Sequence, residues 1–247
     1  MLTINHLTKH YKGSKKGVTD ISLHIKPGDI YAFIGHNGAG KTTTLKCIAG
    51  IHGFDTGEIK IDGTNILEAP MMCKQKMAYI PDNPDLYEYL TGIQYLNFIA
   101  DVFGIANNDR TERIKKYADA FEITASLGDL ISTYSHGMKQ KLAIISALVH
   151  QPKLLLLDEP FVGLDPKAAV ILKDIMHDIC SNGGAIFFST HVLDVAQKLC
   201  NKVAIIKDGM LVAAGNMEDI VTSNQSLESI FMEVINDAET VENINKA

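Results

Sequence analysis

The stretch GHNGAGKT, residues 35–42, fits the pattern G-x-x-x-x-G-K-[ST] without a mismatch. An apolar strand pattern, IYAFIG, leads into it, and the helical pattern KTTTLKCIAGI follows, which is the context of a phosphate-binding loop. Its three glycines let the backbone turn successive N–H groups toward phosphate oxygens. Lys41 supplies positive charge to the β and γ phosphates, and the Thr42 hydroxyl is a ligand for magnesium. The loop therefore predicts a nucleoside triphosphate site, although it does not by itself separate a kinase, a GTPase and an ATPase. The N-K-x-D element typical of guanine binders does not occur.

A second set of polar residues follows two further apolar strand patterns. LLLLDEP, residues 154–160, has Asp158 and Glu159 directly after four leucines, and His191 follows AIFFST. Ligands of α/β sheets bind at the carboxyl ends of the strands, so these side chains are expected beside the phosphate loop. There Asp158 would meet magnesium, Glu159 would orient or deprotonate the attacking water, and His191 would hydrogen-bond the γ-phosphate.

These side chains can meet only if a sheet brings distant segments together. Strand patterns occur over residues 2–9, 21–26 and 30–35 and in GEIKIDG, whereas apolar residues at helical spacing dominate about 83–150. After that segment, the strand patterns KLLLLDE, GAIFFST and KVAIIKDG alternate with helices. This order predicts an α/β fold: a phosphate-loop NTPase core with a mixed or parallel sheet, an N-terminal antiparallel part and an inserted helical subdomain.

The composition narrows the class of protein. The 247 residues carry a net charge of −6, which argues against a nucleic-acid binder because such proteins usually have a basic face. Four cysteines without C-x-x-C spacing predict free thiols. The N-terminal residues lack the apolar core of a signal peptide, and no stretch approaches the ~20 apolar residues that span a bilayer. All of this is typical of a cytosolic protein.

Taken together, the motifs resemble the nucleotide-binding domain of ATP-binding cassette (ABC) transporters over about residues 2–215. GHNGAGKTT is similar to the Walker A motif, LLLLDEP to Walker B, GLDP (163–166) to the D-loop, and His191 to the switch histidine. The resemblance implies ATP and Mg²⁺ as cofactors, with catalytic Glu159, His191 and Lys41. It implies Thr42, Asp82 and Asp158 as metal ligands, and Tyr11 as the aromatic ring that stacks on adenine. The implied nucleotide contacts are Tyr11, Val18, Gly35, His36, Asn37, Gly38, Ala39, Gly40, Lys41, Thr42 and Thr43.

YSHGM, residues 134–138, stands where the family carries its signature sequence, Leu-Ser-Gly-Gly-Gln. In that family two cassettes hold two ATP molecules between them, and the signature of one caps the γ-phosphate bound by the other. The resemblance thus gives Ser135 and Gly137 a role in trans, at the start of a helix whose positive end faces phosphate. The sequence departs from the family pattern at His136, which stands where glycine is usual and faces either nucleotide or solvent. It also departs at Asp82, where the Q-loop glutamine is usual.

The resemblance implies an ATPase subunit that dimerises on ATP and drives an integral membrane permease. S-x-G-M-[KR]-Q and YIPDNPDLYEYLT resemble the branch of bacterial drug, peptide and lipid exporters, including Ecs-type systems. The expected location is the cytoplasmic face of the membrane, with no nucleic-acid partner, and the second ATP-binding subunit is either an identical or a different chain. The expected organisation is an ABC ATPase domain over 1–217 and an acidic, partly helical extension over 218–247. The alternatives are a soluble ABC ATPase acting on ribosomes or DNA, and a phosphate-loop kinase.

Overall fold

The computed structural model describes residues 1–13, 16–221 and 225–233. Its strands form two sheets, one of four strands in the order β2-β1-β4-β5 and one of six in the order β10-β9-β3-β8-β7-β6. The strands are β1 (Leu2–His10), β2 (Gly17–Ile25), β3 (Ile30–Ile34), β4 (Thr56–Ile61), β5 (Thr64–Asn65), β6 (Met77–Ile80), β7 (Leu154–Asp158), β8 (Ala185–Thr190), β9 (Lys202–Lys207) and β10 (Met210–Asn216). The smaller sheet is antiparallel. The larger is parallel except for its edge strand β10. The predicted α/β fold with a mixed sheet and an N-terminal antiparallel part is therefore confirmed.

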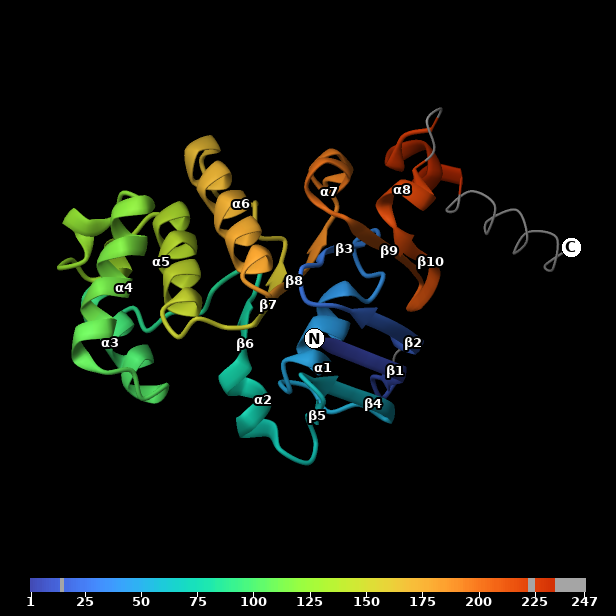
Figure 1. The fold of residues 1–247 in the computed structure, drawn as a ribbon, viewed down its shortest axis with the longest axis horizontal. Helices are drawn as coiled ribbons and strands as arrows, with labels where there is room; N and C mark the ends of the chain where they lie inside the picture. Colours follow the sequence, from blue (N-terminus) through green and yellow to red (C-terminus); the bar gives the residue numbers. More distant parts are fainter. Residues whose placement is uncertain (14–15, 222–224, 234–247) are drawn as a thin grey trace, which may run out of the picture.

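Helices cover the larger sheet and form a group of their own at one end of the molecule. They are α1 (Lys41–Ile48), α2 (Pro70–Lys76), α3 (Gly92–Val102), α4 (Asn107–Ala120), α5 (His136–Leu148), α6 (Pro166–Ser181), α7 (Leu193–Leu199) and α8 (Met217–Ile220), with short 3₁₀ turns at Thr124–Ser126 and Ile131–Thr133. Figure 1 shows α3, α4 and α5 packed side by side, away from β1, β2 and β4. This group is the expected helical insertion, and residues 83–91 form a loop that leads into its first helix. In the part of the chain that the structure describes, no helix combines the length and the apolar character that crossing a bilayer requires.

The central strands are apolar on both faces because each face of the larger sheet is covered. Along β3, Ile30, Ala32 and Ile34 join one buried cluster, which includes residues of α5 and α6. Tyr31 and Phe33 join a second cluster, which includes residues of α1 and the antiparallel sheet. This alternation is the period of two of a strand buried between two layers. Packing on both faces of the sheet holds the carboxyl ends of β3, β7 and β8 at the same edge.

The predicted elements and the observed ones differ at the start of β2 and in the edge strands. Strand β2 begins at Gly17, four residues before the predicted start, because residues 17–20 continue its pairing with β1. The edge strands β6 and β10 were not among the predicted strands. As expected of a partly helical extension, residues 227–233 are helical, and Leu227 is fully buried in the cluster that includes α5 and α6. The division after residue 217 stays a prediction, and the predicted fraying of the last ten residues lies outside the described residues.

Candidate functional site: a phosphate loop beside an acidic strand end

The loop between β3 and α1 borders a hollow of about 410 Å³ at the carboxyl edge of the larger sheet. Gly40 lies just before α1 with φ 113°, a conformation that favours glycine. A Cβ added there would lie 2.6 Å from Cγ1 of Val18, so the loop packs directly on β2. The first turn of α1, with its free N–H groups, therefore opens into the hollow.

Most of the predicted site residues share this hollow. Those that line it are Tyr11, His36, Asn37, Gly38, Gly40, Lys41, Thr42, Thr43, Asp82, Asp158 and Glu159. The structure does not bring Val18 into the hollow, because its side chain is fully buried behind Gly40. Gly35 and Ala39 likewise back the loop and do not line the hollow. Lys16 and Gly17 line the hollow but were not predicted. In the sequence they are a lysine and a glycine close to a predicted strand, and this pattern is too common to indicate a binding site.

The Lys41 ammonium group lies at the centre of the loop and is nearly buried. Its Nζ donates to the carbonyl oxygen of Gly35 at 2.6 Å. The same nitrogen lies 3.5 Å from Oε1 of Glu159, and both side chains are shielded from solvent. A buried ammonium needs such partners, and a phosphate offers stronger ones than a backbone carbonyl.

Glu159 is held from two sides at the end of β7. Its Oε2 lies 3.0 Å from Nδ1 of His191 and also accepts from the His191 backbone N–H at 3.3 Å. Its backbone has φ 48°, the left-handed region, which costs a non-glycine residue free energy and is found mainly where function requires it. Residues 41, 159 and 191 thus form one chain of charged or chargeable groups, as their positions at neighbouring strand ends predicted.

Asp158 lies behind Glu159 and is almost fully buried. The Ser189 hydroxyl donates to Oδ1 of Asp158, and the Ser189 hydroxyl oxygen accepts from the Glu159 backbone N–H at 3.1 Å. Ser189 therefore fixes the orientation of the acidic pair from the adjacent strand β8. A buried carboxylate needs such a donor to remain charged.

Asp82 completes a group of three carboxyl groups around the hollow. Partial burial raises its pKa above the ordinary value, and the negative charges of Asp158 and Glu159 raise it further. The nearby imidazoles of His136 and His191 act in the opposite direction. The negative charges of the three acids thus act on one another around the hollow.

Tyr11 also borders the hollow. Its hydroxyl lies 3.4 Å from the Thr43 hydroxyl, and its ring meets the His52 ring edge-on at 6.1 Å between centroids. The ring is half-buried and rises next to the phosphate loop. A flat aromatic surface at this position suits stacking with a base.

Ser135 and Gly137 are not among the residues that line this hollow. Ser135 is the N-cap of α5, where its Oγ accepts from the Met138 backbone N–H at 3.3 Å. The hydroxyl hydrogen is not used in that bond. The start of α5 therefore carries a hydroxyl donor and the first backbone N–H groups of the helix.

The phosphate loop after β3, the acidic pair after β7 and the sheet order between them define a phosphate-loop NTPase. The profile of the family described as "ABC transporter" matches residues 18–162, more than half of the chain. The ABC-type transporter ATP-binding protein EcsA of Bacillus subtilis is 31% identical over 238 residues, which cover 95% of this chain and 96% of EcsA.

Solved structures agree with this assignment. An ATP-binding subunit of an ABC transporter has a TM-score of 0.90 and 32% identity, covering 95% of this chain and 99% of that one. A dimeric ATP-binding cassette in a post-hydrolysis state with ADP and Pi has a TM-score of 0.80 at 22% identity, covering 88% of this chain and 99% of that one. At this identity the similarity is one of fold alone. The chain belongs to the ABC transporter family. It is the ATP-binding subunit type of that family, an ATPase.

Proposed function

We propose that this chain hydrolyses ATP between two cassettes and thereby drives export through a separate membrane permease. The observation that carries the proposal is the chain of Lys41, Glu159 and His191 at the edge of the phosphate loop. Export is supported by the branch resemblance of the signature region and of YIPDNPDLYEYLT. The expected location is the cytoplasmic face of the membrane, where the chain binds as a peripheral subunit.

Lys41 and Glu159 exchange partners when ATP binds. In the structure, the ammonium group is shared between the Gly35 carbonyl oxygen and the Glu159 carboxylate. A γ-phosphate in the hollow attracts the ammonium more strongly, because charge-assisted bonds to phosphate are among the strongest in proteins. Glu159 is then released from Lys41 and is free to orient a water and take its proton, while His191 holds the other carboxylate oxygen.

The oxygen donors of the hollow fit a magnesium ion. Thr42 offers an exposed hydroxyl, and Asp158 and Asp82 offer carboxylates that border the same space. Among the described residues, no three acidic, imidazole or thiol groups form a metal site by themselves. That is usual for Mg²⁺, which binds through one or two carboxylates together with substrate phosphates. Thr42 and Asp158 would hold the ion, which would neutralise phosphate charge. Asp82 would reach the ion with a shorter side chain than the glutamine that is usual at this position in the family.

Dimerisation couples ATP binding to movement. Ser135 and Gly137 lie outside the chain's own hollow, so they are available to a second cassette. Two copies with two-fold symmetry would each cap the ATP of the other. Since the capping contacts need the γ-phosphate, ATP shifts the population toward the closed dimer and hydrolysis shifts it back.

An exposed aromatic cluster at the start of the helical group suits the permease. Tyr89 is 76% exposed, and Tyr87 and Phe98 are 46% and 42% exposed. The Tyr87 ring lies 5.9 Å from Tyr89 and 5.7 Å from Phe98 between centroids. Exposed contiguous aromatic surface is typical of protein interfaces. This cluster begins five residues after Asp82, so a docked partner could act on the hollow through a short loop.

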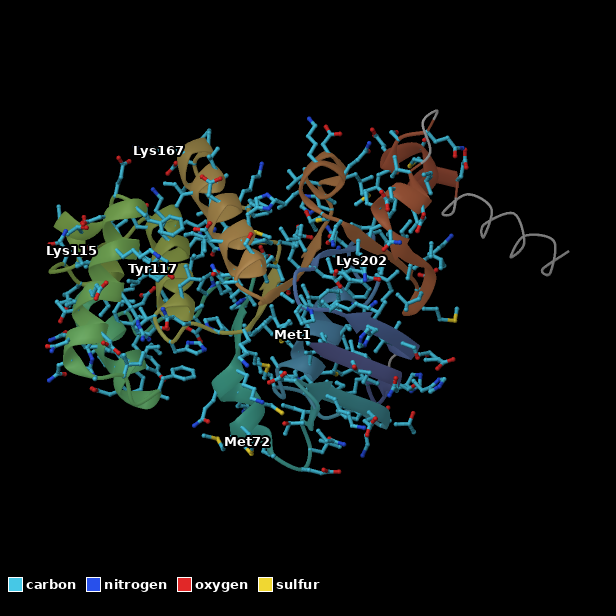
Figure 2. All side chains as sticks on the ribbon, in the orientation of Figure 1. Met1, Met72, Lys115, Tyr117, Lys167 and Lys202 are labelled. Carbon is cyan, nitrogen blue, oxygen red and sulfur yellow. The ribbon has the colours of Figure 1, made fainter. Side chains whose placement is uncertain are left out.

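The experiment is co-purification from detergent-solubilised membranes with a tagged chain. We expect one integral membrane protein to copurify with the wild type and to be lost with Tyr89→Glu. Met72→Glu is the matched control, because Met72 is a comparably exposed apolar residue on the outer side of α2, away from α3 and α4 (Figure 2). Copurification with ribosomes or DNA and with no membrane protein would contradict the proposal.

A further inference from the structure

His136 neither faces only solvent nor lies in the hollow of its own chain. It is the first residue of α5, and its imidazole rests on Gly163, the first residue of the GLDP segment. A Cβ added to Gly163 would lie 2.6 Å from Cδ2 and 2.7 Å from Nε2 of His136. A side chain at residue 163 would therefore require the imidazole to move, because the ring covers the Gly163 backbone directly.

Gly163 is fixed by this packing and by its own backbone. Its φ is 80°, a conformation that other residues rarely adopt. On the same side of α5, a Cβ added to Gly137 would lie 2.9 Å from the Gly163 carbonyl oxygen. Two successive residues at the start of α5 therefore contact one peptide of the segment that joins Glu159 to α6.

A second contact ties α5 to the end of the same segment. Lys141 Nζ lies 2.7 Å from Oδ2 of Asp165, and Oδ1 of Asp165 accepts from the Ala168 backbone N–H as the N-cap of α6. The segment 159–165 is thus held by α5 at its middle and at its end. Its beginning is Glu159 with its left-handed backbone.

The other side of the imidazole faces the loop that follows Asp82. His136 and Lys139 border a hollow of about 530 Å³ together with residues 83–86 and Glu88. Lys139 also forms an ion pair with Glu88. His136 therefore stands between the loop 82–88, which leads to the exposed aromatic cluster, and the segment 159–165, which carries Glu159.

We propose that His136 is a positioning residue that transmits the placement of the loop 82–88 to Glu159 through Gly163 within one subunit. The imidazole fills the space over Gly163 that a glycine at residue 136 would leave open. The inference rests on the proposed role of Glu159 and adds to it a contact within the chain. It assigns His136 to the hydrolytic step rather than to nucleotide binding, because a shift of Glu159 weakens the geometry of attack without changing the phosphate loop.

The test compares His136→Ala, His136→Gln and His177→Ala in ATPase assays. His177 is an exposed histidine on α6 beside Gly28, at the opposite end of the sheet, and is the matched control. We expect His136→Ala to lower kcat about tenfold with KM for ATP within about twofold. His136→Gln keeps a planar group of similar reach over Gly163 and should retain most of kcat, as should His177→Ala. A kcat of His136→Ala within about twofold of the wild type overturns the inference.

A double-mutant cycle tests the contact itself by thermal unfolding. Gly163→Ala should lower the Tm of the wild type by about 6 °C, and by about half as much in the His136→Ala background, where the clash is removed and only the backbone strain remains. Equal Tm losses in both backgrounds would overturn the contact. The Tm cycle does not depend on catalysis. If Glu159→Gln hydrolysed ATP normally, the proposed function would fail, and the cycle would still report on His136 and Gly163 separately.

Discussion

Nδ1 of His191 lies 3.0 Å from Oε2 of Glu159, while Nζ of Lys41 lies 3.5 Å from Oε1 of the same carboxylate. One carboxylate is therefore shared by two basic groups from different elements, the phosphate loop and the end of β8. The two contacts differ in accessibility: the Lys41 side chain is nearly buried, whereas about half of the His191 side chain is exposed. His191 can therefore respond to a ligand that enters from the open side, and Lys41 to one that lies in the loop.

We predict that His191→Ala lowers kcat about a hundredfold and leaves the Kd for ATP little changed. The reason is that the imidazole orients Glu159 and meets the γ-phosphate, whereas the phosphate loop binds the nucleotide without it. Single-turnover hydrolysis and equilibrium nucleotide binding separate the two effects. A parallel loss of binding and hydrolysis would show that His191 only supports the fold of the site.

Substitution of Asp82 tests its place near the metal. We expect Asp82→Ala to raise the Mg²⁺ concentration for half-maximal hydrolysis about tenfold, since one oxygen donor near the ion is lost. Asp82→Gln, which carries a longer arm with an amide oxygen, should hydrolyse ATP at nearly the wild-type rate. Asp85→Ala is the control, because Asp85 is an exposed acid in the same loop. An unchanged Mg²⁺ requirement in Asp82→Ala would remove Asp82 from the metal site.

Ser135 has two roles that can be separated by choice of substitution. Ser135→Ala removes the phosphate cap and also the N-cap of α5, which costs about 1 kcal/mol of stability. Ser135→Asp keeps an N-cap acceptor of similar strength, but its negative charge opposes a phosphate. We therefore predict that Ser135→Asp has the Tm of the wild type and fails to form an ATP-dependent dimer.

Analytical ultracentrifugation in the Glu159→Gln background measures this dimer, and nucleotide binding to the monomer serves as the control. Both Ser135 variants should bind ATP as monomers with the wild-type Kd. A Ser135→Asp protein that dimerised as tightly as its parent would contradict capping in trans.

The stability of the chain should depend on pH through His150. Its ring stacks on Phe103 at 3.7 Å between centroids, its Nε2 lies 3.1 Å from the Met77 carbonyl oxygen, and its Nδ1 is buried without a partner. Burial lowers the pKa of His150, and the nearby Arg113 charge lowers it further, although the hydrogen bond to Met77 opposes both. The unfolded chain therefore binds a proton more readily than the folded one. The contribution of the neutral His150 side chain to the free energy of unfolding is fully present above the unfolded pKa of about 6.5. It is lost as the pH falls from there through the lower pKa of the folded state.

Thermal unfolding between pH 7 and pH 5.5 measures this effect. We expect His150→Phe, which keeps a ring against Phe103, to reduce the slope of Tm against pH to about half that of the wild type. His177→Ala should leave the slope unchanged. A wild-type slope in His150→Phe would assign the pH dependence to other groups.

The local parts of the site could be predicted, and the non-local ones could not. The glycine spacing of 35–42 and the acidic pair after four leucines are contiguous patterns with one physical meaning, so Lys41 and Glu159 were found from the sequence. Their contact across 118 positions was expected only in outline, because it depends on the order of β3, β8 and β7. The packing of His136 on Gly163 was missed because it requires the exact approach of α5 to a turn. The burial of Val18 behind Gly40 was not foreseen for the same reason, since the two residues are 22 positions apart in sequence.

The edge strands β6 and β10 were not predicted because fully buried strands leave the clearest pattern in a sequence. Strand β10 has an alternating half-exposed pattern, and β6 has only four residues. Along β7 and β8, by contrast, every residue is buried. The helical group was predicted as a block, and the loop that leads into it was expected at 82–90, close to its observed position at 83–91.

The central claim is that Glu159 activates the water that attacks ATP, and Glu159→Gln tests it most directly. Glutamine has nearly the same shape but cannot take a proton. We predict that Glu159→Gln binds ATP as the wild type does, hydrolyses it at least about a hundredfold more slowly, and accumulates as an ATP-bound dimer. Single-turnover hydrolysis of radiolabelled ATP measures the rate. A Glu159→Gln protein that hydrolyses ATP at the wild-type rate would contradict the account.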